Sequence, residues 1–337
     1  MKIRDDVKLD FNDVLIEPAV SEVTSRKDID LTRKYKFKHS QAEWEGFPIV
    51  ASNMYATGTY EMWQSLSSKN CMTALHKYNE IVNWPLLYNQ DTIPTWNNVW
   101  HTIGIDDEAL DYFADCLSQR LPISFLMIDV ANGYMTKMTD FVKKAREKCP
   151  THTICAGNVC TDIGVERLIM AGADIVKIGI GPSIVCDTRI VTGVGYPQLS
   201  AIIEAANIAH HYNAHIIADG GCKTIGDISK AFAAGADYVM LGTMLTGYKE
   251  NSGKIVDGKL EVFGMSSNNA LNQFHGGKAT HRASEGNAIW VDCKDESVVK
   301  MIDEIKGGVA STCSYVGAKK LKDLSKCTTF IKVNRIK

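Results

Sequence analysis

AGADIVKIGIG (residues 171–181) and AGADYVMLGTM (residues 234–244) are two copies of one pattern. Each copy has the small residues and the glycine of a helix end, then a continuously apolar run, then a loop that contains glycine. A strand that is apolar throughout is typical of a parallel sheet with both faces covered. Packing and helix capping account for the A-G-A-D part, whereas the glycines after each strand fall where barrels place ligand sites. The repeat therefore predicts an α/β fold.

Six further short runs have the same apolar, β-prone character. With the two copies above they make eight predicted strands, at residues 48–52, 71–75, 99–105, 124–131, 151–158, 174–180, 214–221 and 238–243. Amphipathic stretches of helical length separate most of them, for example residues 134–148, 161–171, 198–211 and 224–234. Eight β/α units in 337 residues fit a closed barrel better than an open sheet. We therefore predict a single-domain (β/α)8 TIM barrel over residues 1–337.

A long insertion follows the eighth predicted strand. Residues 248–307 include Asp257-Gly258 between β-prone flanks, which predicts a hairpin, and then a stretch at 264–286 rich in Ser, Asn, Gly and His. Long insertions on the catalytic face of a barrel are commonly lids. The alternative is a solvated insertion with no function.

Composition excludes several classes of partner. Basic and acidic residues nearly cancel, 37 against 39, and no long run of one sign occurs, which argues against nucleic acid or a membrane surface as partner. Neither a targeting segment nor an apolar run of about 20 residues is evident, so we expect a cytoplasmic protein. The ten cysteines form no C-x-x-C pair and indicate reduced thiols, and the nine histidines show no metal-ligand spacing.

One cysteine stands out by position. Cys186 lies in GIGPSIVCDTR, residues 179–189, directly after the sixth predicted strand. Main-chain amides of such a turn and the cation of Arg189 favour the thiolate, which is the nucleophilic form of cysteine. A structural cysteine is the alternative, but loops at the carboxyl ends of barrel strands are where barrel enzymes act. Cys186 is therefore the candidate nucleophile.

Three further loops are candidates for ligand contacts. ADGG at 218–221 and LGT at 241–243 end the seventh and eighth strands, where glycine lets main-chain amides approach a phosphate; tight turns without a ligand are the alternative. Asp219 would repel phosphate and suits a sugar diol instead. Asp129, in DVANG at 129–133, either faces the site or caps the helix that begins near Tyr134.

Taken in order, these motifs resemble those of the IMP dehydrogenase/GMP reductase family over essentially the whole chain. The ordered set is DVANGY, AGNVCT, GIGP…VC-T-R, TGVGYPQLSA, ADGG, GAD-VMLG, GMSS, RASEG and STCSYVGAKKL. The dehydrogenases of this family usually carry an inserted pair of regulatory modules and an Arg-Tyr flap. Neither is evident here, so the chain is more similar to the reductases of the family.

This resemblance implies a reaction in which GMP and NADPH give IMP, ammonia and NADP. It implies that the Cys186 thiolate attacks C2 of the purine and that ammonia departs, so that a covalent thioimidate remains on the cysteine. Hydride from NADPH then reduces C2 and frees the enzyme. Thr188 and Glu285 match the proton relay. Two alternatives stay open: oxidation of IMP with NAD, as in the dehydrogenases, and a nucleotide-binding protein with weak or lost catalysis.

The resemblance also implies ligand roles for particular residues, and a homotetramer. Substrate-binding positions are Asp219, Gly220, Gly221, Gly242, Thr243, Met265, Ser266, Ser267, Arg282, Ala283, Ser284 and Gly286. Positions near the NADPH cofactor, some of them contacting a neighbouring subunit, are Ser25, Arg26, Lys77, Asp129, Val130, Ala131, Ser311, Thr312, Cys313 and Ser314. A potassium ion bound by main-chain carbonyls would involve Gly181, Ser183, Cys186 and Arg189.

Several residues depart from the family pattern. Ser183 replaces a glycine and Ile184 replaces a serine that binds phosphate, a loss of about 1.5–3 kcal/mol for a hydrogen bond to a charged group. Phe263 stands where a tyrosine usually bonds the same phosphate. Tyr55, Thr57 and Asp187 are further departures. We expect these changes to cluster around one ligand and to affect the phosphate and potassium sites.

Overall fold

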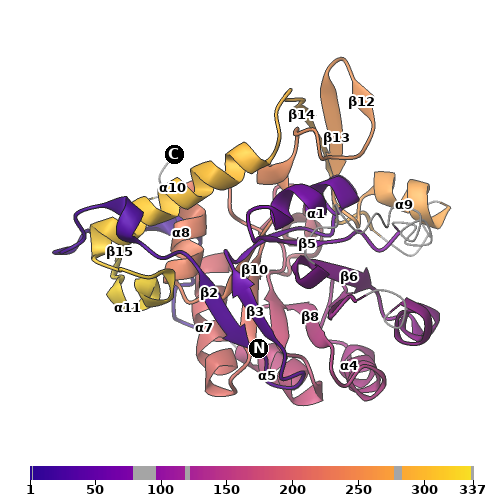
Figure 1. Ribbon diagram of the computed structural model, residues 1–337. Helices are drawn as coiled ribbons and strands as arrows, with labels where there is room; N and C mark the ends of the chain where they lie inside the picture. The colour runs from indigo at the N-terminus through magenta and orange to yellow at the C-terminus, as the bar shows by residue number, and fades with distance from the viewer. Residues whose placement is uncertain (2, 79–95, 118–121, 277–282, 335–337) are drawn as a thin grey trace.

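The structure, a computed structural model, describes residues 1, 3–78, 96–117, 122–276 and 283–334. Eight parallel strands close into a barrel in the order β10-β11-β4-β5-β6-β7-β8-β9 (Figure 1). All eight predicted strands are confirmed, as β4 (Ile49–Ala51), β5 (Met72–Ala74), β6 (Val99–Ile103), β7 (Phe125–Asp129), β8 (Thr153–Val159), β9 (Ile175–Ile178), β10 (His215–Asp219) and β11 (Tyr238–Leu241). Almost every residue in them is buried, which is why the sequence shows apolar runs rather than alternation.

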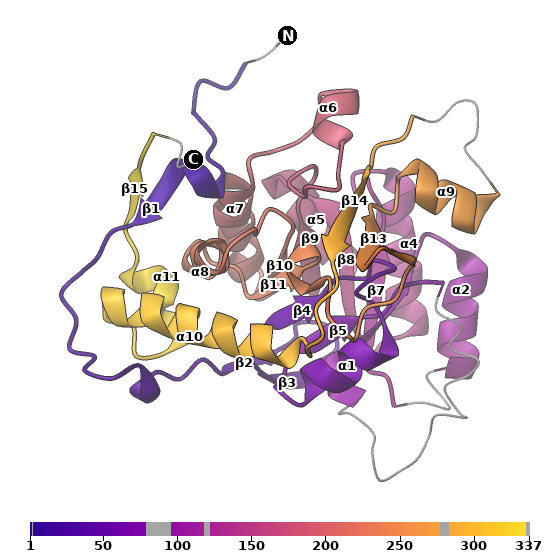
Figure 2. The same ribbon diagram turned by 90° about the horizontal axis from the view of Figure 1, so that it is seen from above.

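Helices surround the strands (Figure 2). The four example helices are confirmed within two residues at each end, as α4 (Thr136–Lys148), α5 (Asp162–Ala171), α7 (Gln198–His211) and α8 (Ile225–Ala233). α5 ends at Gly172, whose φ of 117° is the left-handed conformation of the glycine cap predicted from the repeat. The other helices of the ring are α1 (Tyr60–Ser67), α2 (Asp107–Tyr112) with the π-helical η5 (Phe113–Leu117), and α10 (Val299–Val316). No helix in the described ranges combines the length and apolarity needed to span a bilayer.

A hairpin closes the amino-terminal end of the barrel. It consists of β2 (Arg33–Lys36) and β3 (Glu43–Gly46), and the sequence prediction missed it because both strands are short and at least half of the residues in each are charged. Its aromatic side chains point inward: Tyr35 and Trp44 are buried and both pack against Tyr238 of β11. The hairpin thus completes the interior of the barrel with aromatic rings.

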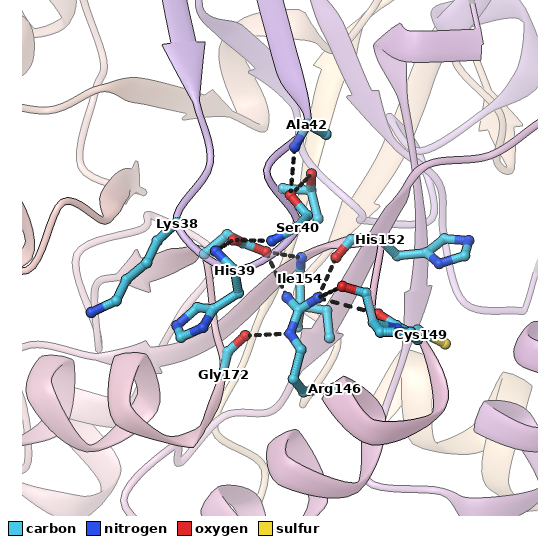
Figure 3. Close-up of polar contacts among 12 residues, drawn as sticks. Lys38, His39, Ser40, Ala42, Arg146, Cys149, His152, Ile154 and Gly172 are labelled. Atoms are coloured by element: carbon cyan, nitrogen blue, oxygen red, sulfur yellow. Dashed lines mark hydrogen bonds and ion pairs between the residues drawn. The ribbon is translucent and has the colours of Figure 1, made fainter.

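The aspartate of the first A-G-A-D copy fastens this hairpin to the barrel. Asp174 is fully buried and accepts the main-chain amides of His39 at 2.6 Å, Ser40 at 3.1 Å and Ile154 at 3.0 Å. The guanidinium of Arg146 pairs with it at 2.6 Å. That guanidinium also donates to the carbonyls of four residues, Cys149, Pro150, His152 and Gly172. Figure 3 shows it beside Cys149, His152 and Gly172. The packing interpretation of this motif is confirmed.

The insertion after β11 forms a small antiparallel sheet and a helix. Its elements are β12 (Ile255–Val256), β13 (Lys259–Phe263), α9 (Asn268–His275) and β14 (Ala288–Asp292), and Figure 1 shows the sheet projecting beyond the barrel. The predicted hairpin is confirmed, with positive φ at Asp257 (50°) and Gly258 (73°). The predicted end of the insertion at residue 307 is wrong. Residues 299–307 belong to α10, whose apolar residues at helical spacing pack against α8 in the outer ring.

Short elements complete the chain. β1 (Val14–Ile16) pairs antiparallel with β15 (Phe330–Lys332), which brings two segments near the ends of the chain together. The remaining elements are η1 (Phe11–Asp13), η2 (Arg26–Asp28), η4 (Trp96–Asn98), α6 (Thr188–Thr192), η6 (Thr243–Leu245), η7 (Leu321–Asp323) and α11 (Leu324–Cys327).

Candidate active site

A cavity lies where the carboxyl ends of the barrel strands meet the insertion. Its walls come from six of the eight barrel strands or the loops after them and from two segments of the insertion. They are residues 52–54, 129–131, 158, 177, 179–186, 188, 219–223, 240–243, 264–266 and 285–286. A barrel with its site at this end follows the general rule for the fold. The insertion therefore contributes to the cavity wall.

Three of the cavity residues form a hydrogen-bonded chain. The Cys186 thiol lies 3.3 Å from Oγ1 of Thr188, and that hydroxyl donates to Oε2 of Glu285 at 3.0 Å. Cys186 is half-buried, so the sulfur is reachable from the cavity. Heavy-atom distances in this range allow a proton to move along the chain. The structure therefore brings together all three residues of the predicted catalytic set.

The insertion holds the cysteine loop in this position. Gly286 forms a bridge with Cys186, and the amide of Asp187 donates to the carbonyl of Glu285 at 2.8 Å. Gly264 approaches the carbonyl of Val185 so closely that an added Cβ would lie 2.5 Å from its oxygen. A side chain at this glycine would push the insertion and the loop apart. Glu285 thus reaches Thr188 because main-chain contacts fix the two segments together.

A buried ion network forms the floor of the cavity. The ammonium of Lys177 lies 2.8 Å from Oδ1 of Asp129 and 2.5 Å from Oδ2 of Asp219. Asn53 donates to the other oxygen of Asp129 at 2.8 Å, and Asn158 donates to Oδ2 of Asp219 at 2.9 Å. Both contacts of Asp219 use Oδ2, which leaves Oδ1 to accept from a ligand hydroxyl. Asp129 is therefore not a helix cap, and Met135 occupies the cap position of α4.

Charge pairing overrides burial in this network. Burial by itself would lower the pKa of Lys177, but the carboxylates of Asp129 and Asp219 hold it above its ordinary value. Burial would raise the pKa of Asp129, but the ammonium of Lys177 and the amide of Asn53 hold it below its ordinary range. Lys177 and Asp129 therefore stay charged at neutral pH.

Sequence reasoning missed Lys177, Asn53 and Asn158. Lys177 had a detectable signal, because a charged residue within the apolar run IVKIG of a buried strand requires a partner. The two asparagines had none, because each follows or ends a strand like many turn residues. Their role depends on which strands lie beside them in the barrel.

Most predicted substrate positions line the cavity. Asp219, Gly220, Gly221, Gly242, Thr243, Met265, Ser266 and Gly286 are in its walls. Ser267 is not: it is buried, and its hydroxyl accepts the Ala270 amide at 3.2 Å as the cap of α9. Ala283 and Ser284 lie beside the lining segment but outside it, and Arg282 lies outside the described residues.

The predicted cofactor positions fall into two groups. Asp129, Val130 and Ala131 line the cavity, and Lys77 is exposed, with its ammonium over the Tyr78 ring. Ser25 and Arg26 belong to the segment of η2, which packs on α10, the helix that carries Ser311–Ser314, apart from the cavity.

One cofactor position is wrong for this structure. Cys313 has no exposed surface, and burial raises the pKa of its thiol to about 12, because it faces the core on the inner side of α10. Thr312 also faces inward and donates to the hydroxyl of Ser229 at 2.9 Å. Ser311 and Ser314 are partly exposed, and the Ser314 hydroxyl donates to the carbonyl of Ser311 at 2.7 Å.

The departures from the family pattern do not all surround one ligand. Ser183 and Ile184 line the cavity. Phe263 and Tyr55 instead stack on each other, with ring centroids 5.9 Å apart, outside the cavity lining. The expectation that these two residues surround the ligand is therefore wrong. They form one aromatic contact between β13 and the loop after β4.

The other two departures have local polar partners. Thr57 is buried and its hydroxyl donates to the carbonyl of Ser52 at 2.9 Å. Asp187 accepts the side-chain amide of Asn287 at 2.8 Å. That contact directs the carboxylate of Asp187 to the insertion and makes it another tie between the insertion and the cysteine loop.

A second cysteine of the cavity serves as a contrast. Cys222 is 8% exposed, and burial raises the pKa of its thiol, which disfavours the thiolate. Most described cysteines are buried in the same way, as expected of structural thiols. In the described ranges, no cluster of His, Cys, Asp and Glu could hold a metal ion.

The fold and the cavity define a (β/α)8-barrel protein with a cysteine-threonine-glutamate relay at its carboxyl-terminal mouth. The model of the IMP dehydrogenase / GMP reductase domain matches residues 99–336. Proteins named GMP reductase from Shewanella pealeana and Escherichia coli O157:H7 are 48% and 47% identical over 337 residues, covering 99% of this chain and 97% of each relative. The chain belongs to the IMP dehydrogenase/GMP reductase family.

A solved structure shows the same fold. A GMP reductase variant from Trypanosoma brucei, in complex with guanosine 5′-monophosphate, is 23% identical to this chain with a TM-score of 0.86. The match covers 98% of this chain and 96% of that chain. At this identity the likeness supports the barrel architecture.

Proposed function

We propose that this protein is a GMP reductase that converts GMP to IMP and ammonia with NADPH. The observation that carries the proposal is the hydrogen-bonded chain of Cys186, Thr188 and Glu285 at the cavity wall. The relatives that are 47–48% identical over almost the whole chain, each named GMP reductase, support the choice of substrate.

In the first step a proton leaves the Cys186 thiol and passes through the Thr188 hydroxyl to the Glu285 carboxylate. The thiolate attacks C2 of the purine and forms a carbon–sulfur bond. Glu285, through Thr188, returns the proton to the 2-amino nitrogen, and the C2–nitrogen bond breaks as ammonia leaves. A covalent thioimidate on Cys186 remains, so one difficult substitution becomes two easier steps.

The second step needs an electron pair at C2. A reduced nicotinamide supplies hydride to that carbon when it is bound, and the carbon–sulfur bond then breaks to release IMP and the thiolate. Asp129, Val130 and Ala131 line the same cavity as Cys186 and are where we place the nicotinamide. Because the charges of Asp129 and Lys177 are already paired, this part of the cavity suits a neutral, amide-bearing ring better than it would suit another anion. Family membership supports a nicotinamide cofactor, and NADPH is the form we propose.

Ribose and phosphate positions follow from the loops after β10 and β11. Oδ1 of Asp219 is available to accept from a ribose hydroxyl, because both protein contacts use Oδ2. Gly220 and Gly221 have φ of 86° and 89°, a conformation that suits glycine and that shapes a turn for close ligand approach. The loops after the seventh and eighth strands are the usual phosphate site of this fold.

Potassium and the homotetramer are parts of the same proposal. The carbonyl of Ser183 already accepts the Cys186 amide at 3.1 Å, but a carbonyl oxygen has a second lone pair for a cation. Carbonyl oxygens of this loop suit potassium as ligands. Ser25, Arg26, Ser311 and Ser314 would contact a neighbouring subunit or its cofactor. Turnover in potassium against sodium buffer, and mass by light scattering, test these two parts.

Turnover assays decide between the proposal and its alternatives. GMP-dependent oxidation of NADPH by the wild type supports a reductase, whereas reduction of NAD with IMP supports a dehydrogenase. Cys186→Ala should abolish turnover and Cys222→Ala, the matched control in the same cavity, should retain it. Mass spectrometry of the wild type with GMP should find a purine-nucleotide adduct on Cys186. Wild-type turnover no better than that of Cys186→Ala would favour a binding protein without catalysis.

A further inference from the structure

The charged side chains that line the cavity do not by themselves favour a phosphate, because acidic residues outnumber basic ones. The charged residues that line it are three acids, Asp129, Asp219 and Glu285, and two lysines, Lys177 and Lys223. The phosphate of a nucleotide monophosphate carries about −1.5 to −2 charge at neutral pH. It therefore needs a cation or several amide donors in a cavity whose own charge is negative.

Lys177 cannot serve, because two carboxylates already hold its ammonium on the floor of the cavity. Lys223 differs from it. Among the residues that the structure describes, no carboxylate lies within ion-pair distance of its ammonium, and the residue is exposed. It is thus the cation of the cavity wall that a ligand can engage without breaking a protein ion pair.

The position of Lys223 agrees with a phosphate role. It follows Gly220 and Gly221 in the loop after β10, the seventh strand of the barrel, where this fold usually binds phosphate. Its main-chain amide donates to Oδ2 of Asp227 at 3.0 Å, which fixes the backbone while the side chain stays free. A fixed backbone reduces the conformational freedom that binding must remove.

Ile184 explains why a cation is needed at this end of the site. Its side chain is 42% exposed, lines the same cavity and offers no hydrogen-bond donor. The Phe263 ring is turned away to Tyr55 and contributes none either. With apolar residues at both positions, a charged donor from another loop can take their place beside the main-chain amides of the glycine loops.

We propose that the ammonium of Lys223 binds the 5′-phosphate of the substrate and sets the preference for a nucleotide over the corresponding nucleoside. The inference rests on the proposed function for the identity of the substrate. A lysine suits the task because it acts as a point charge with three donors and needs no fixed fork geometry.

The experiment compares wild type, Lys223→Ala, Lys223→Arg and Lys332→Ala, an exposed lysine of β15 that does not line the cavity. Equilibrium binding and kcat/KM are measured with GMP and with guanosine. Lys223→Ala should weaken GMP binding about 10- to 100-fold, the range for a lost hydrogen bond to a charged group, and should change kcat less than about threefold. Guanosine binding should change less than about twofold, and Lys223→Arg and Lys332→Ala should resemble the wild type.

Two results would overturn the assignment: unchanged GMP binding in Lys223→Ala, or equal losses for GMP and guanosine. The initial slope kcat/KM gives the comparison even where guanosine does not saturate. The assay also separates this inference from the proposed function. A protein that binds GMP through Lys223 but oxidises no NADPH would refute the reductase and leave the phosphate contact standing.

Discussion

Asp174 and Asp237 occupy the same place in the two A-G-A-D copies, and each accepts a main-chain amide of the preceding barrel strand at 3.0 Å. The donors are Ile154 in β8 and Ile216 in β10. Both carboxylates are buried, and both have cationic partners, Arg146 for Asp174 and Arg33 for Asp237. Each aspartate also contacts the β2–β3 hairpin. The two copies of the repeat therefore form the same kind of contact between the hairpin and the barrel.

Asp174→Ala should therefore destabilise the fold without touching the active site. It leaves the Arg146 guanidinium without its carboxylate and removes the acceptor of three amides, so the free energy of unfolding should fall by about 3–5 kcal/mol. Urea unfolding checks this value. Asp111→Ala, which removes a surface ion pair with Lys148, is the control and should have a much smaller effect. Equal effects of the two changes would contradict the role of Asp174.

The relay makes a prediction about rate rather than affinity. Thr188→Val and Glu285→Gln should each lower kcat about 10²- to 10⁴-fold, because each breaks the path by which a proton reaches the leaving amine. The dissociation constant for GMP should change little. Thr192→Val, at an exposed threonine of the same short helix, should keep the wild-type rate. A lower affinity at normal kcat would place the two residues in binding instead.

Lys177→Met should be among the most damaging single changes. It leaves two half-buried carboxylates without a cation, so the protein should be clearly less stable than the wild type, and the pKa of Asp129 should rise. Thermal unfolding gives the comparison. Adding Asp129→Asn to Lys177→Met should recover part of the loss, because one unpaired charge disappears. A double variant less stable than Lys177→Met would contradict the pairing.

Ile184→Ser should increase the affinity for GMP. A serine at this position of the cavity wall provides a hydroxyl donor for an anion, and one such bond is worth about 1.5–3 kcal/mol, or roughly 10- to 100-fold in KM. Ile190→Ser, in the exposed helix α6, is the control and should have no effect. An unchanged or higher KM for Ile184→Ser would mean that the phosphate lies elsewhere.

His101 should make the fold sensitive to acid. The imidazole is buried in β6 and stacks on Phe113, and burial lowers its pKa from 6.5 to about 4. Below pH 6.5 the unfolded chain takes up a proton that the folded protein excludes until about pH 4, so stability falls as pH decreases through this window. The loss should reach about 2 kcal/mol at pH 5 relative to pH 8.

His101→Phe should remove this part of the pH dependence, because phenylalanine does not titrate and can keep the stacking contact with Phe113. Urea unfolding at pH 8 and pH 5 measures the difference for both proteins. His210 is the wrong residue for such a test, because its bond to Asp237 raises its pKa. The same acid loss in wild type and variant would show that other groups cause it.

Much of the barrel was predictable from particular residues. Strand β9 is apolar along its length apart from Lys177, and Gly172 before it adopts the left-handed cap that its place after a helix indicated. The hairpin of β2 and β3 was not predictable in the same way. Its buried Tyr35 and Trp44 alternate with exposed charged residues over only four positions, too short a pattern to distinguish from a loop.

The sequence by itself determined the closed barrel of eight strands and the place of Cys186, because buried strands must be apolar and the ends of barrel strands meet at one mouth. Only the tertiary structure decided which groups act on that cysteine. Thr188 and Glu285 are 97 residues apart in the sequence. Lys177, Asp129 and Asp219 lie on three different strands, β9, β7 and β10. Such contacts depend on distances across the barrel, which no local pattern of residues contains. The same is true of Tyr55 and Phe263. Their rings stack because the folded chain brings β13 of the insertion beside the loop after β4.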